Sequence, residues 1–582
     1  MPRVRVLAAA AACLAVPILV TTLFSSGAPP QAPPSQLVAE NPCPRTEVDP
    51  LGLNRQVTSR CDRTSEEPVR DDAPIHVTLD SGPSFTLGAE PWRRGGQLSS
   101  DPTWQMTMFS LDWVPPLVRR AISDSQDEVK ERLLATVTRF YAENPDPGNN
   151  DRGWDEGTSL RRLEALSCLY SMTSDRRLIP AMEAEAGVLF SDRYYGPPNH
   201  PVHNHGLMAN VRLIEAGRQI GRDDWVRDAT ARLKDEMPEA FSTSGTTLEQ
   251  SSGYQIINAN MWAGAGRMVA AADPDDPFLT LLGETVTRAR GVAAWLTEPD
   301  GRIVQIGDAN RVKGTATDCS APGLFRDDEA GLVVGRWSWT DPKTTYFTLR
   351  YGPPRRSHGH HDQGSLTWTA GGHRVLVGSG FFGYDQKDPL VVWGFSPAAA
   401  NVARPPGAAP TRKDGFILVD EAQDAAGRTL TLTGSPYGAQ QRRIVHIDPG
   451  RAGVSTATIT DDLPSGAESP LEQRWLLDPD WTAAKQLAPG RWSLTHKSGA
   501  QLVVDSPGAT IAAVRGSSDP IGGWVFPHRG QKQPAYQLTI TGPGLVRTTF
   551  RLTTEKPAPS GSATPSVDPT ASSHADAAQA AP

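Results

Sequence analysis

Cysteine is scarce in this chain: five of its 582 residues are cysteine, and no two are spaced as a CxxC pair. The missing pair argues against a zinc site built on cysteines. Cys43 and Cys61 flank a polar, loop-like stretch, and we expect them to form a disulfide. Cys168 lies in the helical pattern LEALSCLYSM and is expected to be a buried thiol.

An excess of positive charge is also missing, because the formal net charge is −8. A chain with this balance has no general attraction for polyanions, so a site for an acidic polymer has to be a local basic patch. We therefore expect no nucleic-acid partner.

One long apolar run stands at the N-terminus. Val6–Phe24 follows Arg3 and Arg5, is interrupted by Pro17 and leads into small residues. This order predicts a signal peptide over residues 1–28 and a secreted or cell-surface protein. The run of about 20 residues is also long enough for an uncleaved anchor, in which case the membrane is a partner.

The rest of the chain divides by composition and by apolar period. Residues 29–72 are rich in proline and polar side chains and are expected to form a linker or irregular cap. Residues 73–315 repeat apolar positions with helical spacing and predict a helical bundle or α/α toroid. Residues 316–554 alternate with period two and predict an antiparallel β-sandwich. The low-complexity residues 555–582 are expected to be disordered.

Histidines are concentrated in two short windows, and a pocket between domains is the usual place for such clusters to meet. These windows hold seven of the twelve histidines: His200, His203, His205, His358, His360, His361 and His373. In the first window, HNHG, the alternative is that Asn204 only caps a helix. The second, SHGHH, reads either as a polar loop or as the start of a strand. In a strand, His358 and His360 share one face and His361 points to the other.

Other polar side chains are candidates for the same pocket. In TTLEQSSGYQ, Glu249 and Tyr254 are expected to project into the cavity of the helical domain, unless the run only supplies a helix cap. In GWDEGTSLRR, Trp154 offers a surface for stacking a sugar and Arg161 an anion ligand. The alternative for that segment is an ordinary solvated helix start.

Three arginines precede or enter the second histidine window. Arg350, Arg355 and Arg356 give the cleft local positive charge despite the negative total. We expect Arg355 and Arg356 to bind an anionic substrate.

The order of these motifs resembles the heparinase II/III-like polysaccharide lyases. HNHG is followed fifty residues on by LEQSSGYQ, and later by LRYGPPRRSHGHHDQGSLTW and HRVLVGSGFFGY. DGRIVQIGDANR is similar to the segment that ends the toroid in that family. The resemblance covers roughly residues 104–404. It implies an incomplete α/α toroid followed by an antiparallel β-sandwich, the same order that the periodicity gives.

The resemblance also implies β-elimination on a uronate-containing polysaccharide. Asn204 and His205 match the pair that binds the substrate carboxylate, Tyr254 the catalytic tyrosine, and His358 the histidine from the sandwich. Glu249 is a weaker match, expected to orient its neighbours. The chemistry suits these residue types, because the C5 proton becomes acidic only when the carboxylate is neutralised. A base then takes that proton and an acid protonates the departing O4.

A structural zinc of the family is expected to be absent, so no cofactor is expected. Of three ligands that the resemblance implies, only His360 is matched. Gly378 takes the place of an aspartate and the region of Ala400 the place of a histidine. Asp362 and His373 are reserve ligands. A tyrosine that often follows the aspartate is replaced by Phe382, with Tyr384 two positions further on.

The sequence thus predicts a secreted polysaccharide lyase acting on an anionic polysaccharide. One alternative is a glycoside hydrolase that uses Asp155 or Glu156 together with Glu249 as paired carboxylates. The other is a non-catalytic glycan-binding or envelope protein on a lyase scaffold.

Overall fold

The structure is a computed structural model that describes residues 49–554, apart from 54–59, 67–68, 80–81, 89–91, 93–97, 149–151, 196–203, 316–322, 452 and 465–468. The predicted signal peptide and the predicted disordered tail lie outside the described residues, as does Cys43. Among the helices that are described, none has the length and apolar character needed to cross a membrane. All described residues belong to one compact unit, Asn41–Pro582.

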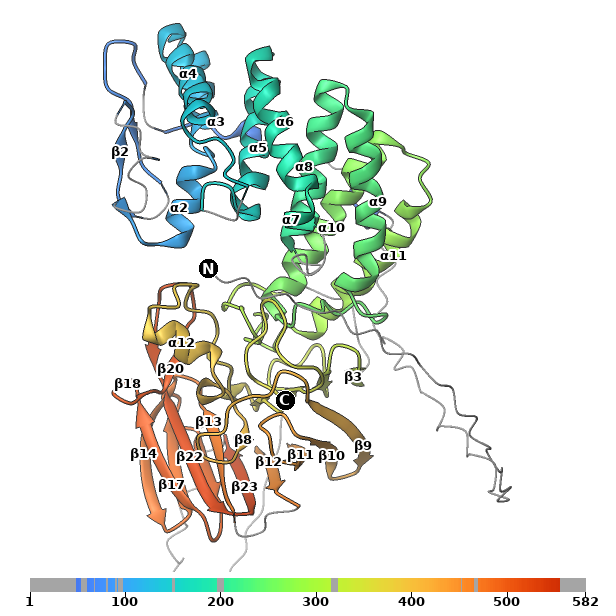
Figure 1. Cartoon of the computed structure of the whole chain (residues 1–582). Coiled ribbons are helices and arrows are strands. Elements are labelled where there is room, and N and C mark those ends of the chain that lie inside the picture. Colours follow the sequence, from blue (N-terminus) through green and yellow to red (C-terminus); the bar gives the residue numbers. More distant parts are fainter. Residues whose placement is uncertain are drawn as a thin grey trace, which may run out of the picture. The chain divides into compact units, whose positions relative to one another are not determined.

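Helices form the first part of the described chain (Figure 1). After η1 (Arg60–Asp62), β1 (His76–Val77) and β2 (Phe85–Thr86) come α2 (Pro102–Phe109), α3 (Val114–Ser123), α4 (Asp127–Glu143), α5 (Glu156–Thr173), η3 (Arg176–Leu178), α6 (Ile179–Phe190), α7 (Asp192–Tyr195), α8 (Asn204–Ile220), α9 (Asp223–Ala240), α10 (Ser252–Ala272) and α11 (Phe278–Trp295). The spacing of apolar residues explains the packing: on α4, Val129, Leu133, Val137 and Phe140 are buried on one face.

The long helices form successive hairpins. α3 contacts α4, α5 contacts α6, α8 contacts α9 and α10 contacts α11, while α5, α8 and α10 contact one another in sequence. Short connections between neighbouring helices produce this arrangement. The predicted helical region in the form of an incomplete toroid is confirmed.

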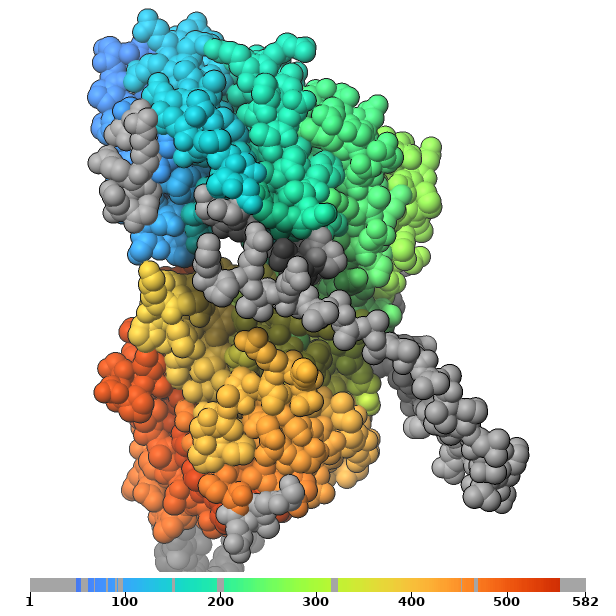
Figure 2. Space-filling model, viewed as in Figure 1, coloured from blue at the N-terminus to red at the C-terminus, as the bar shows by residue number. Residues whose placement is uncertain are grey.

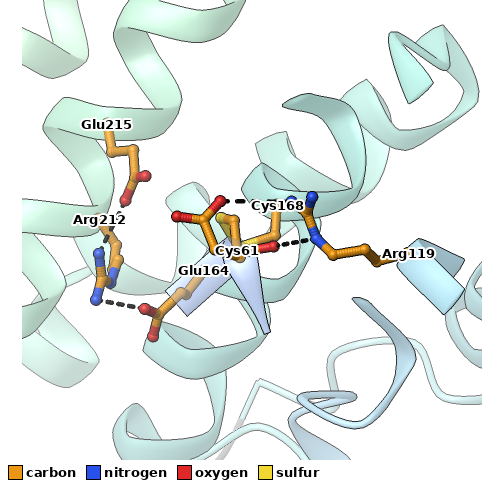
Figure 3. The surroundings of a disulfide bond; sticks show 7 residues. Cys61, Arg119, Glu164, Cys168, Arg212 and Glu215 are labelled. Carbon is orange, nitrogen blue, oxygen red and sulfur yellow. Dashed lines mark hydrogen bonds and ion pairs between the residues drawn. A yellow bond between two sulfur atoms is a disulfide. The ribbon is translucent and has the colours of Figure 1, made fainter. Parts of the chain in front are cut away.

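A disulfide joins Cys61 to Cys168 on α5 (Figure 3). The predicted pair of Cys43 and Cys61 is therefore wrong, and so is the prediction that Cys168 is a free buried thiol. Arg119 holds the same segment, because its Nε donates a hydrogen bond to the Cys61 carbonyl at 2.7 Å. The covalent bond was not predictable from spacing, since its two cysteines are 107 residues apart.

Strands form the second part of the described chain (Figure 1). Their bounds are β3 (Gly323–Asp327), β4 (Leu332–Arg336), β5 (Tyr346–Arg350), β6 (Leu366–Ala370), β7 (His373–Leu376), β8 (Ala403–Arg404), β9 (Phe416–Asp424), β10 (Gly427–Gly434), β11 (Gln441–Arg451), β12 (Val454–Asp462), β13 (Pro470–Leu476), β14 (Trp481–Ala488), β15 (Arg491–His496), β16 (Gln501–Asp505), β17 (Thr510–Arg515), β18 (Ser517–Ser518), β19 (Ile521–Gly522), β20 (Trp524–Val525), β21 (Gln533–Pro534), β22 (Tyr536–Pro543) and β23 (Leu545–Thr553). The short α12 (Pro389–Phe395) and η4 (Pro397–Ala399) separate β7 from β8.

Three antiparallel sheets build the sandwich. One has five strands in the order β3-β4-β5-β6-β7, one has four in the order β17-β22-β13-β8, and the largest has eight in the order β14-β15-β16-β23-β12-β11-β10-β9. Side chains from all three share one apolar core, which includes Trp368, Val445, Trp475, Leu538 and Phe550. Sheets that pack face to face in this way form a β-sandwich, as predicted.

The end of the helical part packs against the five-stranded sheet. Trp295 at the end of α11 lies in a buried apolar cluster with Phe325, Val334 and Tyr346, and the Tyr346 hydroxyl donates to the Trp295 carbonyl at 3.1 Å. Strands β4, β5 and β6 are buried along their whole length, as expected when both faces of a sheet are covered. Figure 2 shows side chains filling the spaces between the ribbons in both parts.

Candidate active site

The start of α10 positions Tyr254. Ser251 caps this helix, since its hydroxyl accepts a hydrogen bond from the Tyr254 backbone N–H at 3.3 Å. The same hydroxyl donates to the Asp308 carbonyl at 2.9 Å, which fixes the helix start against the segment that ends the helical part. The cap that the sequence offered as an alternative is thus real, and it serves to place Tyr254 in the first turn.

The SHGHH window is a loop and not a strand, because β6 begins only at Leu366. Strand alternation therefore does not explain how His358 and His360 are oriented, because the segment is not a strand. Nevertheless, His358 and His360 reach the same side chain: the His358 Nδ1–H donates to Asp308 Oδ2 at 2.8 Å and the His360 Nε2–H to Asp308 Oδ1 at 3.0 Å. His361 is held elsewhere, through a backbone hydrogen bond to the Phe395 carbonyl at 3.0 Å.

Tyr254, His358 and Tyr384 form the centre of the site. The rings of Tyr254 and His358 stack with centroids 3.5 Å apart and planes 7° from parallel. The Tyr384 hydroxyl lies 3.1 Å from the Tyr254 hydroxyl and 3.4 Å from His358 Nδ1. Tyr254 is half-buried, and 39% of Tyr384 is exposed, so the two hydroxyls meet at the edge of the site that faces solvent.

Glu249 links the first histidine window to this centre. Its Oε1 accepts hydrogen bonds from the Asn204 backbone N–H at 3.0 Å and from Asn258 Nδ2 at 2.9 Å. Its Oε2 lies 3.4 Å from His358 Nε2 and has no hydrogen-bond partner in the part of the chain that is described. His358 therefore lies between two buried carboxylates, Glu249 and Asp308. Glu249 thus contacts Asn204 and His358, and its role in orienting them stays a prediction.

Electrostatics set the charge of these groups. Burial alone raises the pKa of Asp308, but the hydrogen bonds from His358 and His360 outweigh it and lower the pKa, so this carboxyl is ionised. Burial raises the pKa of Glu249, although the charge of His358 and the hydrogen bonds from Asn258 and Asn204 oppose the rise. Burial also raises the pKa of Tyr254 and of Tyr384, which keeps both phenols protonated at neutral pH.

His205 and Arg161 lie beside the centre. A Cβ placed on Gly157 would be 3.5 Å from His205 Cε1 and 3.7 Å from Arg161 Nη1, so the three residues are neighbours. The Arg161 guanidinium donates to the Gly157 carbonyl at 2.7 Å, and its charge acts to lower the pKa of Tyr254. The structure thus brings the predicted Asn204, His205 and Arg161 near Tyr254, while His200 and His203 lie outside the described residues.

The arginines of the second window do different things. Arg356 is exposed next to the site, and its backbone N–H donates to Gln250 Oε1 at 2.7 Å. Arg355 donates to the carbonyls of Gly359 and Ser357, so its side chain braces the histidine loop. Arg350 is buried with its Nε 3.2 Å from Asp362 Oδ1, so its charge is not available to the cleft. Of these three arginines, Arg356 is the one whose exposed side chain is not bound to another group of the described chain, which suits it to an anionic substrate.

Trp154 is not a sugar-stacking surface. Only 3% of it is exposed, it packs with Val188 and Tyr194, and the Arg162 guanidinium lies 4.6 Å from its ring. The prediction for Trp154 is therefore wrong, because a buried ring has no face left for a sugar. Asp155, a candidate for the hydrolase alternative, caps α5 through a 2.8 Å hydrogen bond from the Thr158 backbone N–H.

The residues at the zinc position do not fit a zinc ion. His360, Gly378 and Ala400 do line one small cavity of about 20 Å³, as the alignment of motifs implied. However, Gly378 and Ala400 offer no donor atom, the His360 Nε2 is bonded to Asp308, and Arg350 adds a positive charge to the cavity wall. The reserve ligands are engaged as well, Asp362 beside Arg350 and His373 with Ser498 at 2.9 Å.

Asp308 and Asn258 are site residues that the sequence did not single out. Asp308 lies within DGRIVQIGDANR, a segment recognised only for its place at the end of the toroid. The sequence feature that could have pointed to Asp308 is its place directly after the largely apolar IVQIG. In the structure Asp308 is 6% exposed. Tyr384 was noted only as a displaced tyrosine, and the structure brings it to the centre of the site.

Comparison with known proteins supports both parts of the fold. Residues 326–566 match the family model described as Heparinase II/III-like, C-terminal. No match was found among curated proteins. A mutant of the heparan sulfate lyase HepC from Pedobacter heparinus is similar in structure, with a TM-score of 0.61 and 14% sequence identity over 87% of each chain.

A structure of heparinase III gives the same result. Its TM-score is 0.64 and its sequence identity 15%, and the match covers 78% of this chain and 77% of that chain. At such low identity these similarities show the fold, which confirms a helical toroid followed by an antiparallel sandwich. The match of the C-terminal part to the family model confirms the resemblance predicted from the motifs.

Proposed function

We propose, from the match of residues 326–566 to the heparinase II/III-like polysaccharide lyases, that the chain cleaves a uronate-containing polysaccharide by β-elimination. One observation carries this proposal: two protonated tyrosines and a histidine held by Asp308 meet at a solvent-facing edge between the helices and the sandwich. Elimination needs a proton acceptor and a proton donor on one sugar residue, and this cluster supplies both.

The substrate we propose is an anionic polysaccharide. The proteins of similar structure include one named as a heparan sulfate lyase, and heparan sulfate is a uronate-containing polyanion. Near the site of this chain, Arg161 and the exposed Arg356 supply positive charge. They offset the negative total only locally, as binding of an acidic polymer requires.

Asn204 and His205 neutralise the substrate carboxylate in this proposal. Both lie in the first turn of α8, where backbone N–H groups without helical partners favour a negative charge. The Glu249 carboxylate fixes the start of this helix by accepting the Asn204 backbone N–H. Neutralising the carboxylate makes the C5 proton removable.

His358 is the proposed base. With its Nδ1–H donated to Asp308, its Nε2 has a lone pair that can accept the C5 proton. The C5–C4 double bond then forms as the C4–O4 bond breaks. The imidazolium that results lies between the carboxylates of Asp308 and Glu249, which stabilise its charge.

Tyr254 is the proposed acid. Its raised pKa keeps the phenol protonated, and Tyr384, 3.1 Å away, hydrogen-bonds to the same hydroxyl. The phenol gives its proton to the departing O4, and the proton returns from His358 or from water. The Tyr254 and His358 rings are stacked, so the proposed donor and acceptor are held next to each other.

We also propose that the protein is exported, to the outside of the cell or to its surface. The disulfide between Cys61 and Cys168 supports this, because disulfides persist mainly in oxidising compartments. The N-terminal sequence expected to be a signal peptide points the same way.

Product analysis tests the function. The purified protein is incubated with alginate, heparan sulfate, hyaluronan and bacterial exopolysaccharides. A lyase leaves an unsaturated uronate that absorbs ultraviolet light, and this is the expected result on at least one polymer. New reducing ends without that absorbance would mean hydrolysis, and an intact but bound polymer would mean a non-catalytic glycan-binding protein. Either outcome would refute the proposal.

Replacing Tyr254 by phenylalanine tests the site. The change removes one hydroxyl from a half-buried position, so the fold should persist, while turnover should fall by about 10²–10⁴, the usual contribution of an acid–base group. The matched control is Tyr536→Phe on β22, a partly buried tyrosine of the sandwich far from the site in sequence. If Tyr254→Phe turns over as fast as this control, Tyr254 is not the acid.

A further inference from the structure

The loop between β20 and β21 is fixed against the segment that carries Tyr384. Phe526 donates its backbone N–H to the Ser379 carbonyl at 2.7 Å, and Gly530 donates to the Phe382 carbonyl at 2.8 Å. Arg311 adds a third tie from the helical side, donating its backbone N–H to the Pro527 carbonyl at 2.9 Å. These bonds hold residues 526–530 in a set position relative to the two tyrosines.

Arg529 projects from this loop beside the active site. Its guanidinium carbon is 5.9 Å from the centroid of the Tyr384 ring, within the range of a cation–π contact. Its Nη2 donates a hydrogen bond to the Thr103 hydroxyl on α2 at 2.9 Å. The exposed side chain of Arg529 therefore spans from the sandwich to the helical part.

The charge of Arg529 has no carboxylate partner within the described part of the chain. Its one hydrogen bond there is to a neutral hydroxyl, and the arginine is exposed while Thr103 is half-buried. By contrast, Arg311 and Arg374 are both bound to carboxylates, which include that of Glu298. A guanidinium presents five N–H donors in a fork that fits a carboxylate or a sulfate, so most donors of Arg529 are available to a ligand.

We propose that Arg529 is a substrate-binding residue that selects an anionic group, carboxylate or sulfate, on the saccharide unit next to the bond that is broken. It exchanges the weak bond to Thr103 for a charge-assisted pair with that group. This inference rests on the proposed function and adds to it, because it assigns a charge preference to one side of the site. The loop ties explain why the guanidinium stays within reach of Tyr384.

Steady-state kinetics on heparan sulfate separate this role from catalysis. Arg529→Gln should raise KM about 10–100-fold with little change in kcat, since a hydrogen bond to a charged group contributes about 1.5–3 kcal/mol. Arg529→Lys should recover part of the loss. The matched control is Lys532→Gln in the same loop, where the ammonium lies over the Trp524 ring, and KM should be unchanged.

Thr103→Val tests whether Arg529 only holds the two parts of the chain together. Valine removes the hydroxyl that Arg529 binds but leaves the guanidinium, so KM should stay the same or fall. If Thr103→Val raises KM as much as Arg529→Gln, the arginine is structural and the proposal is wrong. It is equally wrong if Arg529→Gln leaves KM unchanged.

Binding measurements separate this inference from the proposed function. Calorimetry on the inactive Tyr254→Phe protein compares heparan sulfate oligosaccharides with desulfated and with carboxyl-reduced ones. The affinity difference between the protein with Arg529 and the Arg529→Gln variant should vanish for one of the modified ligands. If it vanishes for the desulfated ligand the bound group is sulfate, and if it vanishes for the carboxyl-reduced ligand the bound group is carboxylate. Binding without any cleavage by the parent would refute the lyase and leave the role of Arg529 standing. If the Arg529→Gln variant binds each of these ligands with the same affinity as the protein that keeps Arg529, that role is refuted.

Discussion

Asp308 is the side chain on which both histidines of the site depend. It accepts a hydrogen bond from His358 and another from His360, and its carbonyl accepts one from Ser251. The carboxylate keeps the His358 proton on Nδ1 and thereby leaves Nε2 unprotonated. An aspartate that only orients a histidine leaves substrate binding almost untouched when it is replaced.

We therefore expect Asp308→Asn to lower kcat by about 10²–10⁴ and to change KM little. The measurement is the initial rate of ultraviolet-absorbing product. Asp328→Asn is the matched control, because Asp328 is also paired, but with Arg326 and Tyr351 and not with the histidines of the site. A kcat of Asp308→Asn close to that of the control would show that His358 does not need this carboxylate.

His360 has a different prediction, which concerns zinc. Because the one carboxylate in the cavity beside it, Asp362, is paired with Arg350, we expect the purified protein to hold far less than one zinc per chain. Elemental analysis after dialysis measures this directly. One zinc per chain that disappears in His360→Ala would contradict the prediction.

The sequence singled out Tyr254, His358, Asn204 and Glu249 correctly as neighbours, because each lies in a motif with a recognisable order. It could not single out Asp308, since one aspartate among loop residues has no pattern of its own. Its role arises only because residues fifty positions apart meet in the fold. The prediction for Trp154 is wrong because nothing in a short motif shows that the ring is covered by Arg162, which lies on α5.

The first turn of α5 carries a titratable group that the site does not use. Burial raises the pKa of Glu156 to about 7, and the charges of Asp155 and Glu236 add to the rise. In the unfolded chain this carboxyl titrates near 4.3. The folded form thus holds the proton more tightly, and the stability that this gives at low pH is lost as the pH rises through about 7.

Replacing Glu156 by glutamine should remove that loss. The free energy of unfolding of Glu156→Gln minus that of the parent should therefore become larger by about 1–3 kcal/mol between pH 5 and pH 8. Thermal or denaturant unfolding at several pH values measures it. Glu128→Gln, an exposed glutamate in the first turn of α4, is the control and should show no such trend. A difference that stays constant with pH would mean that Glu156 ionises normally.

Periodicity predicted helices and strands better than it predicted the loop between them. The helices of residues 102–295 have buried stripes that a 3.6-residue repeat reveals, as on α4. The SHGHH segment fits the start of a strand as well as a polar loop, because alternating histidines imitate a two-residue period, and the structure has the loop. Pairing of β5 with β6 starts only after Gly364, which has a φ of +88° that a regular strand does not adopt.

The catalytic cluster exists only when both parts of the molecule are folded and in place. Tyr254 and Glu249 come from the helical part, and His358 and Tyr384 from the sandwich. Their relative position is held by the buried cluster around Trp295 and by the hydrogen bonds of Ser251 and Gln250. Events that loosen either part should therefore reduce activity before the whole chain unfolds.

The disulfide provides the test of this dependence. The bond between Cys61 and Cys168 closes a loop of 107 residues, and loss of a bond that closes so long a loop typically costs about 2–5 kcal/mol of stability. We expect reduction, or the double variant with serine at both positions, to lower the melting temperature and to reduce lyase activity at temperatures below that melting point. Reductant should have no further effect on the double variant.

Peptide mapping without reduction should recover Cys61 joined to Cys168. The reason is that the Cys61 segment, which Arg119 also holds, is bonded to Cys168 on α5. A peptide that joins Cys43 to Cys61 would contradict this pairing, and unchanged melting on reduction would show that the helical part is held by its core alone.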